Sequence, residues 1–213
     1  MLFSEITNIL SEEIKPPKTN GIIVLDIDDT LVTANPDVIK IYKSYNGGPE
    51  EELTTSEFAE DKDKGKPGYK FDIRDFRNPE KVYSSIVKGT PKLKNLKMMD
   101  AYIRAGYDMS FLTARGLEKV VASALSNFLL TRAKSGKLVK IPDNVFSKDM
   151  SAAVNDEDKT YPGANDAEKK ANVLRKLCRK YVQVVFVDDD PRNIAATRSL
   201  SKELNNLKVV KAW

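Results

Sequence analysis

The segment GIIVLDIDDTL, residues 21–31, joins an unbroken apolar run to a cluster of carboxylates. A short run of Ile, Val and Leu that begins at a glycine and ends at polar residues predicts a strand covered on both faces, which is typical of a parallel sheet. Because side chains alternate along a strand, Asp26 and Asp28 fall on the same side. Two neighbouring buried carboxylates resist ionisation unless a cation or a proton neutralises one of them. The segment therefore predicts a buried strand that ends at a metal site.

Composition predicts a globular protein with one α/β core and an insertion, because the chain has 213 residues, of which 41% are hydrophobic. The 35 basic and 31 acidic residues give a net charge of +4, which indicates neither a nucleic-acid nor a membrane partner strongly. No apolar run is long enough to span a bilayer. We therefore expect no membrane association, and nothing in the sequence predicts a protein partner.

Two residue types narrow the chemistry and the compartment. The chain has no histidine, which rules out a Ser-His-Asp triad, a phosphohistidine intermediate and a histidine-ligated zinc site. The single cysteine, Cys178, cannot form an internal disulfide, and it lies in an amphipathic helical pattern. We expect a packed thiol and a cytoplasmic location.

Strand and helix patterns alternate along the second half of the chain. They predict helices over about 78–88, 91–105, 117–133 and 166–180 and from Pro191, and strands over 107–112, 144–146, 182–187 and 208–211. Residues 1–14 have the pattern of an amphipathic helix. Strands that alternate with helices predict a Rossmann-like, doubly wound parallel sheet with helices on both faces, in which ligands bind beyond the carboxyl ends of the strands.

Residues 34–90 lack this alternation and are predicted to form a small cap or flap inserted after the first strand of a single domain, residues 1–213. Residues 38–43 alternate between apolar and polar, and Asn46-Gly47-Gly48 predicts a turn that returns the chain through residues 51–54 as a β-hairpin. Residues 60–69, rich in Lys, Asp, Gly and Pro, predict a flexible exposed connector.

Polar residues follow three of the predicted strands. They are Asp26 to Thr30, then Thr113-Ala114-Arg115, then Asp188 to Asn193. A single acidic strand end is usually a solvated turn or a helix cap. Because the carboxyl ends of parallel strands meet at one edge, we expect all three groups to share one crevice.

These strand ends resemble the motifs of the haloacid dehalogenase (HAD) superfamily of aspartate-nucleophile phosphohydrolases. Its first motif, Asp-x-Asp-x-Thr after an apolar strand, is matched by Asp26, Asp28 and Thr30. Its second motif ends at Thr113, and its fourth ends at the pair Asp188 and Asp189. The third motif is a lysine, for which Lys170 fits best, next to Lys169 and with Lys148 as an outsider. The resemblance covers the sheet from residue 21 onward, whereas residues 34–90 match no cap that we can identify.

The resemblance implies a Mg²⁺-dependent phosphatase with a defined role for each motif. Asp26 would attack phosphorus to form an aspartyl-phosphate, and Asp28 would serve as general acid and then general base. Thr113 and Lys170 would bind the phosphoryl oxygens and complete the catalytic set. Mg²⁺ would be held by Asp26, by the backbone carbonyl of Asp28 and by an acid of the fourth motif, either Asp189 or Asp188.

Two further polar residues near the motifs have two interpretations each. Arg115 either binds the remaining phosphate oxygens of the substrate or is an exposed residue at a helix start, and the two interpretations are equally favoured. Asn193 either supports the metal-binding loop or caps the helix that follows Pro191, and the cap is slightly favoured.

The first functional hypothesis is a phosphomonoesterase that acts on a phosphorylated small molecule, such as a nucleotide, or on the 3′ or 5′ end of a nucleic acid. The resemblance extends to phage and bacterial nucleotide or polynucleotide-end phosphatases, and a small insertion predicts an open site. The alternative is a non-catalytic module that binds Mg²⁺ and phosphate and uses the flap for recognition. Nucleic-acid binding through Lys88, Lys92, Lys94 and Lys97 near Tyr102 is a third hypothesis, although most such lysine runs are solvated helix faces.

Overall fold

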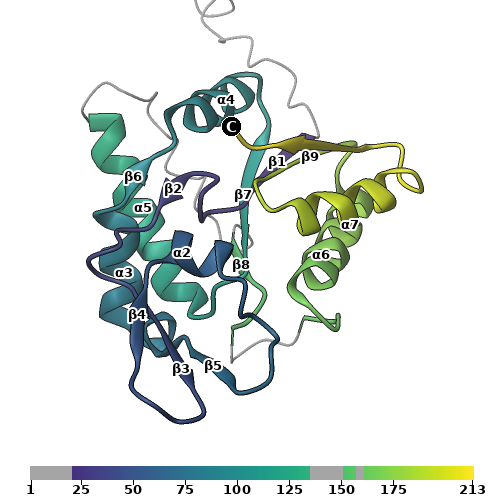
Figure 1. The fold of residues 1–213 in the computed structure, drawn as a ribbon. Coiled ribbons are helices and arrows are strands. Elements are labelled where there is room, and N and C mark those ends of the chain that lie inside the picture. Colours follow the sequence, from purple (N-terminus) through teal and green to yellow (C-terminus); the bar gives the residue numbers. More distant parts are fainter. Residues whose placement is uncertain (1–20, 135–150, 157–160) are drawn as a thin grey trace, which may run out of the picture.

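A parallel sheet of five strands, in the order β10-β9-β1-β7-β8, forms the centre of the molecule (Figure 1). The structure is a computed structural model and describes residues 21–134, 151–156 and 161–213. The strands are β1 (Gly21–Leu25), β7 (Asp108–Thr113), β8 (Ser151–Ala153), β9 (Gln183–Asp188) and β10 (Leu207–Lys211). The helix predicted over 1–14, the strand predicted over 144–146 and Lys148 lie outside the described residues.

Helices cover both faces of this sheet, which confirms the predicted doubly wound fold. On one face lie α3 (Pro79–Val87), α4 (Leu93–Arg104) and α5 (Glu118–Lys134), and on the other lie α6 (Asp166–Lys180) and α7 (Pro191–Ser201). In β1, Ile23 and Leu25 belong to the first core, and Ile22 and Val24 belong to the second. A strand buried on both faces is therefore apolar at every position, as residues 21–25 are.

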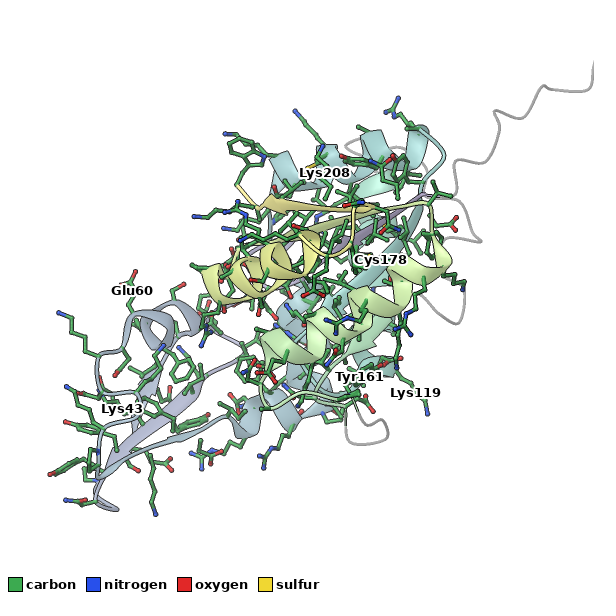
Figure 2. The ribbon with its side chains drawn as sticks, turned by 90° about the vertical axis from the view of Figure 1, so that its right-hand side faces the viewer. Lys43, Glu60, Lys119, Tyr161, Cys178 and Lys208 are labelled. Atoms are coloured by element: carbon green, nitrogen blue, oxygen red, sulfur yellow. The ribbon has the colours of Figure 1, made fainter. Side chains whose placement is uncertain are left out.

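The insertion after β1 carries a small antiparallel sheet of its own. At its base, β2 (Val32–Thr33) pairs with β6 (Thr90–Pro91). Beyond them, β3 (Ile41–Tyr45) pairs with both β4 (Glu51–Leu53) and β5 (Tyr69–Asp72), next to helix α2 (Thr55–Glu60) and the 3₁₀ helix η1 (Arg74–Arg77). Figure 2 shows this part projecting from the main sheet, with Lys43 and Glu60 on it. The hairpin predicted over 38–54 is confirmed, and β5 adds a third strand to it.

The predicted turn has the expected backbone conformation, and the predicted connector forms ion pairs with β3. Asn46 and Gly47 have φ values of 49° and 75°, the left-handed conformation that Asn and Gly adopt most readily. Residues 61–68 contain neither helix nor strand, but Lys43 Nζ lies 2.8 Å from Asp61 Oδ2 and 2.8 Å from Asp63 Oδ2. The connector is therefore tied to β3 through these ion pairs, a contact that the prediction of a flexible segment did not include.

The strand order reverses between β1 and β9, because β7 and β8 lie on one side of β1 and β10 lies beyond β9. In doubly wound sheets, a crevice forms outside the carboxyl ends of the strands at such a switch point. The insertion lies toward the end of the molecule at which β7 leads into the start of α5 (Figure 1). None of the helices in the described ranges is both long enough and apolar enough to cross a membrane.

Candidate functional site

Three carboxylates converge at the switch point of the sheet. Asp26 follows β1, Asp188 is the last residue of β9, and Asp189 follows it. One oxygen of each lies within 4.8 Å of the others. Asp26 and Asp188 are buried and Asp189 is partly buried. The backbone N–H of Asp26 donates to the carbonyl of Val187 at 2.9 Å, so the pairing of β1 with β9 holds the group together.

Lys170 contributes a buried ammonium to these carboxylates. Its Nζ lies 2.7 Å from Asp26 Oδ1 and 2.8 Å from Asp188 Oδ2, and its side chain is 1% exposed. The neighbouring Lys169 contacts Asn155 Oδ1 instead, at 2.6 Å. Of the two adjacent lysines that the sequence left open, Lys170 is therefore the one at the carboxylates.

Burial and like charges disfavour ionisation of the carboxylates. Burial raises the pKa of Asp26 well above its ordinary value, and although Lys170 opposes this rise, Asp188 and Asp28 add to it. Burial also raises the pKa of Asp189 to about 6. Burial alone would lower the pKa of Lys170, but the charges of Asp26 and Asp188 outweigh it and raise that pKa. The carboxylates are more numerous than the one ammonium among them, and a further cation would relieve this excess.

Polar groups around the carboxylates fix their orientation. Asn193 Nδ2 donates to both oxygens of Asp188, at 3.1 and 3.0 Å, and the backbone N–H of Asp190 donates to Asp188 Oδ1 at 2.9 Å. Thr30 Oγ1 donates to Asp189 Oδ1 at 3.0 Å. Asp190 is the N-cap of α7, with a side chain that accepts the N–H of Arg192. The favoured interpretation of Asn193 as a cap is therefore wrong, and its amide supports Asp188.

Asp28 does not belong to the group of three carboxylates and is held by Arg115. Arg115 Nε donates to Asp28 Oδ2 at 2.7 Å, and Nη2 donates to Asp28 Oδ1 at 2.6 Å, which makes a bidentate ion pair. A third nitrogen, Nη1, donates to the buried hydroxyl of Ser85 on α3 at 3.1 Å. Arg115 is only 4% exposed, so its interpretation as an exposed helix-start residue is wrong.

Thr113 occupies the end of β7, next to β1 in the sheet. Its side chain is buried, and its hydroxyl oxygen accepts the backbone N–H of Arg115 at 3.1 Å. This contact shapes the turn that returns Arg115 toward Asp28. Thr113 thus lies at the same sheet edge as the carboxylates, as the motif spacing predicts.

The donor set of Asp26, Asp188 and Asp189 fits a hard divalent cation. All three offer carboxylate oxygens, which are the ligands that Mg²⁺ and Ca²⁺ prefer. Sulfur and imidazole donors, which favour zinc or copper, do not belong to the group. The side chain of Asp28 does not belong to this group, and Arg115 engages both of its oxygens.

The sequence does not predict two contacts of the site, although it places Asp28 and Arg115 at the same crevice. One is the contact of Ser85 with Arg115, which joins residues 30 positions apart across different elements. The other is the pairing of Arg115 with Asp28, which are 87 positions apart. Each residue type alone is common on protein surfaces, so only the folded chain reveals that they meet.

Two of the four lysines of the nucleic-acid hypothesis have contacts with other side chains. Lys92 Nζ lies 3.9 Å from Asp29 Oδ1, and Lys94 Nζ lies 5.6 Å from the ring centroid of Trp213. Lys88 and Lys97 are exposed. These contacts neither support nor contradict nucleic-acid binding.

Comparisons with protein-family models, with curated proteins and with solved structures find no match to this chain. The resemblance to the haloacid dehalogenase superfamily therefore rests on the motifs of the sequence. The site geometry is an independent basis for a functional proposal.

Proposed function

We propose that this protein is a Mg²⁺-dependent phosphomonoesterase of the haloacid dehalogenase type, which forms an aspartyl-phosphate on Asp26 and hydrolyses it. The observation that carries the proposal is the convergence of Asp26, Asp188 and Asp189 at the switch point, with Lys170 bonded to two of them. A carboxylate attacks a phosphate monoester readily only where the negative charge of the phosphoryl group is screened. A lysine and a cation site beside the nucleophile provide that environment.

Each group at the sheet edge has a separate task in this proposal. Mg²⁺, held by Asp26, Asp188 and Asp189, would supply Lewis-acid screening of the phosphoryl oxygens. Lys170 would hold Asp26 in place and offset charge on the transferring group. Thr113 would donate its hydroxyl to a phosphoryl oxygen from the neighbouring strand.

Asp28 would protonate the departing alkoxide oxygen and then take a proton from the water that hydrolyses the intermediate. A carboxylate held by two nitrogens of a guanidinium accepts hydrogen bonds and has no proton to donate, so Asp28 must first leave Arg115 and take up a proton from solvent. The phosphate of a substrate offers Arg115 another bidentate partner. We therefore expect phosphate binding to draw Arg115 away and to release Asp28 toward the leaving oxygen.

The test is hydrolysis of an aryl phosphate, a panel of nucleotides and oligonucleotides phosphorylated at the 3′ or 5′ end, with Mg²⁺ or with EDTA. Asp26→Asn should abolish turnover, and Asp28→Asn should lower it by about 10²-fold or more. Asp100→Asn is the matched control, because Asp100 pairs with Arg104 within α4 and has no step assigned to it. Activity that survives both EDTA and Asp26→Asn would contradict the mechanism.

The ion pair of Asp28 with Arg115 also favours a second candidate, a non-catalytic module that binds Mg²⁺ and phosphate and uses the insertion to recognise a partner or a nucleic acid. If this pair persists when phosphate binds, the site lacks a general acid. Calorimetric binding of Mg²⁺ and inorganic phosphate without turnover of any ester would support this candidate over the enzyme.

A further inference from the structure

A cavity of about 590 Å³ lies beside Asp28, between the insertion and the edge of the main sheet. Asp28 and Arg115 line it, so it adjoins the residues assigned to the departing group. The insertion contributes an apolar wall, and the loop between β7 and α5 contributes Leu117. The apolar residues of the insertion that line the cavity are Ile41, Phe58, Ile73 and Phe76.

We propose that this cavity binds the alcohol portion of the substrate and that this alcohol carries a flat ring, as in a nucleoside monophosphate. The inference rests on the proposed function, because it takes Asp28 as the group that protonates the leaving oxygen. A general acid must lie within hydrogen-bond reach of the atom that it protonates. The alcohol attached to that oxygen therefore extends from Asp28, and the cavity is the space that Asp28 adjoins.

The walls of the cavity select the class of alcohol. Phe58 and Phe76 both line it and both keep part of their side chains accessible. Phe58 packs edge-on against Phe71 at 5.3 Å between ring centroids, and the guanidinium of Arg115 lies 5.5 Å from the ring centroid of Phe76. Lys64 Nζ lies 4.6 Å from the ring centroid of Phe58, so a cation lies over each ring, and a nucleobase would stack on the part of each ring that lines the cavity. A short polar alcohol would leave these ring surfaces in water.

Size and polar groups agree with a mononucleotide. The volume falls within the range of about 300–1,000 Å³ that is usual for small-ligand sites. A few polar residues, Thr55, Asn155 and Asp166, also line the cavity. Asn155 donates to Asp166 at 2.9 Å, so Thr55 and the remaining oxygen of Asp166 would orient a sugar or a base edge. Leu117 and Asp29 line it as well, with φ values of 55° and 54°. Such strained backbone in non-glycine residues is concentrated at ligand sites.

The test compares kcat/KM for nucleoside monophosphates and for glycerol phosphate, which has no ring, in the wild type, Phe58→Leu and Tyr45→Leu. Phe58→Leu keeps an apolar side chain on α2 but removes the ring. Tyr45→Leu makes the same kind of change on β3 of the insertion, at a residue whose ring lies tilted against Tyr69 and that does not line the cavity. We expect KM for the nucleotide to rise at least about fivefold in Phe58→Leu, as lost stacking predicts. Tyr45→Leu should keep the wild-type kcat/KM for both substrates, and thermal unfolding checks that both variants are folded.

An unchanged nucleotide KM in Phe58→Leu, or no preference of the wild type for the nucleotide over glycerol phosphate, would overturn the inference and leave the phosphatase proposal standing. A preference of more than tenfold for a phosphorylated oligonucleotide over the mononucleotide would overturn the inference that the substrate is a small molecule. If no ester is hydrolysed, the proposed function fails, and calorimetric titration of a nucleoside monophosphate then tests the cavity alone. If the nucleoside monophosphate binds and Phe58→Leu weakens this binding, the proposed role of the cavity is supported. If the nucleoside monophosphate does not bind, that role is refuted.

Discussion

Replacing Lys170 by methionine tests the charge balance of the site directly. The change keeps the length and most of the volume of the side chain and removes only the ammonium. In the wild type this ammonium lies 2.7 Å from Asp26 Oδ1 and 2.8 Å from Asp188 Oδ2, in a position that is 1% exposed. The variant leaves two buried carboxylates that lack their shared cation, next to Asp189.

The expected loss of stability follows from this burial. Removing one partner of a buried ion pair costs about 3–5 kcal/mol, because the other charge remains desolvated. Protonation of a carboxylate recovers part of the loss, so we expect about 3 kcal/mol at pH 8, which corresponds to a fall in Tm of about 6–12 °C for a chain of this size. The difference from wild type should narrow at pH 5, where protons neutralise the unpaired carboxylates more readily.

Urea and thermal unfolding in EDTA measure this loss, because no divalent cation can then replace the ammonium. Lys169→Met is the matched control: the adjacent lysine contacts Asn155 at the surface, so its loss should change stability by no more than about 0.5 kcal/mol. Equal unfolding midpoints for the two variants would refute the view that Lys170 balances the buried carboxylates. A difference that widens at pH 5 would contradict the electrostatic cause.

Three further predictions concern other parts of the molecule. Asn193→Ala removes the amide that donates to both oxygens of Asp188, and it should weaken Mg²⁺ binding by about 10–100-fold in calorimetry. Asp75 is partly desolvated, but its pKa is lowered because Lys81 Nζ and a backbone N–H donate to it. Its ionised form therefore stabilises the fold above its unfolded pKa of 3.8, and this stabilisation is lost as pH falls through the folded pKa. Asp75→Asn should therefore be less stable than wild type at pH 7 and lack that acid-dependent loss in pH-dependent melting. A Cβ at Gly89 would clash with the side chain of Val32 and lie 2.7 Å from the carbonyl oxygen of Thr33, so Gly89→Ala should lower Tm, by about 2–4 °C per kcal/mol lost.

The main sheet could be predicted because its signals are local. Each central strand is a short apolar run, and each crossover has a helical pattern that α4, α5, α6 and α7 reproduce within a few residues. The same kind of signal could have separated the two lysines. Lys170, Leu174 and Cys178 are the buried residues of α6, spaced four apart, and Lys169 falls off this stripe. The helical period therefore indicates Lys170, whereas the motif alone does not distinguish it from Lys169.

The insertion was harder to predict, because its order depends on long-range charge pairs. The turn at Asn46-Gly47 has a strong local preference, so the first hairpin was predictable. Strand β5 is short and exposed at alternate positions, and it follows a segment whose composition is typical of disorder. Lys43 binds Asp61 and Asp63 from 18 and 20 positions away, and such pairings do not appear in composition.

The charges at the sheet edge divide into two sets with different consequences. Asp28 and Arg115 neutralise each other in a bidentate pair, so this set attracts neither a metal nor an anion until the pair opens. Asp26, Asp188 and Asp189 share a single ammonium, which leaves two negative charges when all three are ionised. A phosphate dianion would be repelled from this second set, and a divalent cation would make it neutral. In the proposed enzyme the metal must therefore be in place before the phosphate can draw Arg115 from Asp28, so the two sets act in a fixed order.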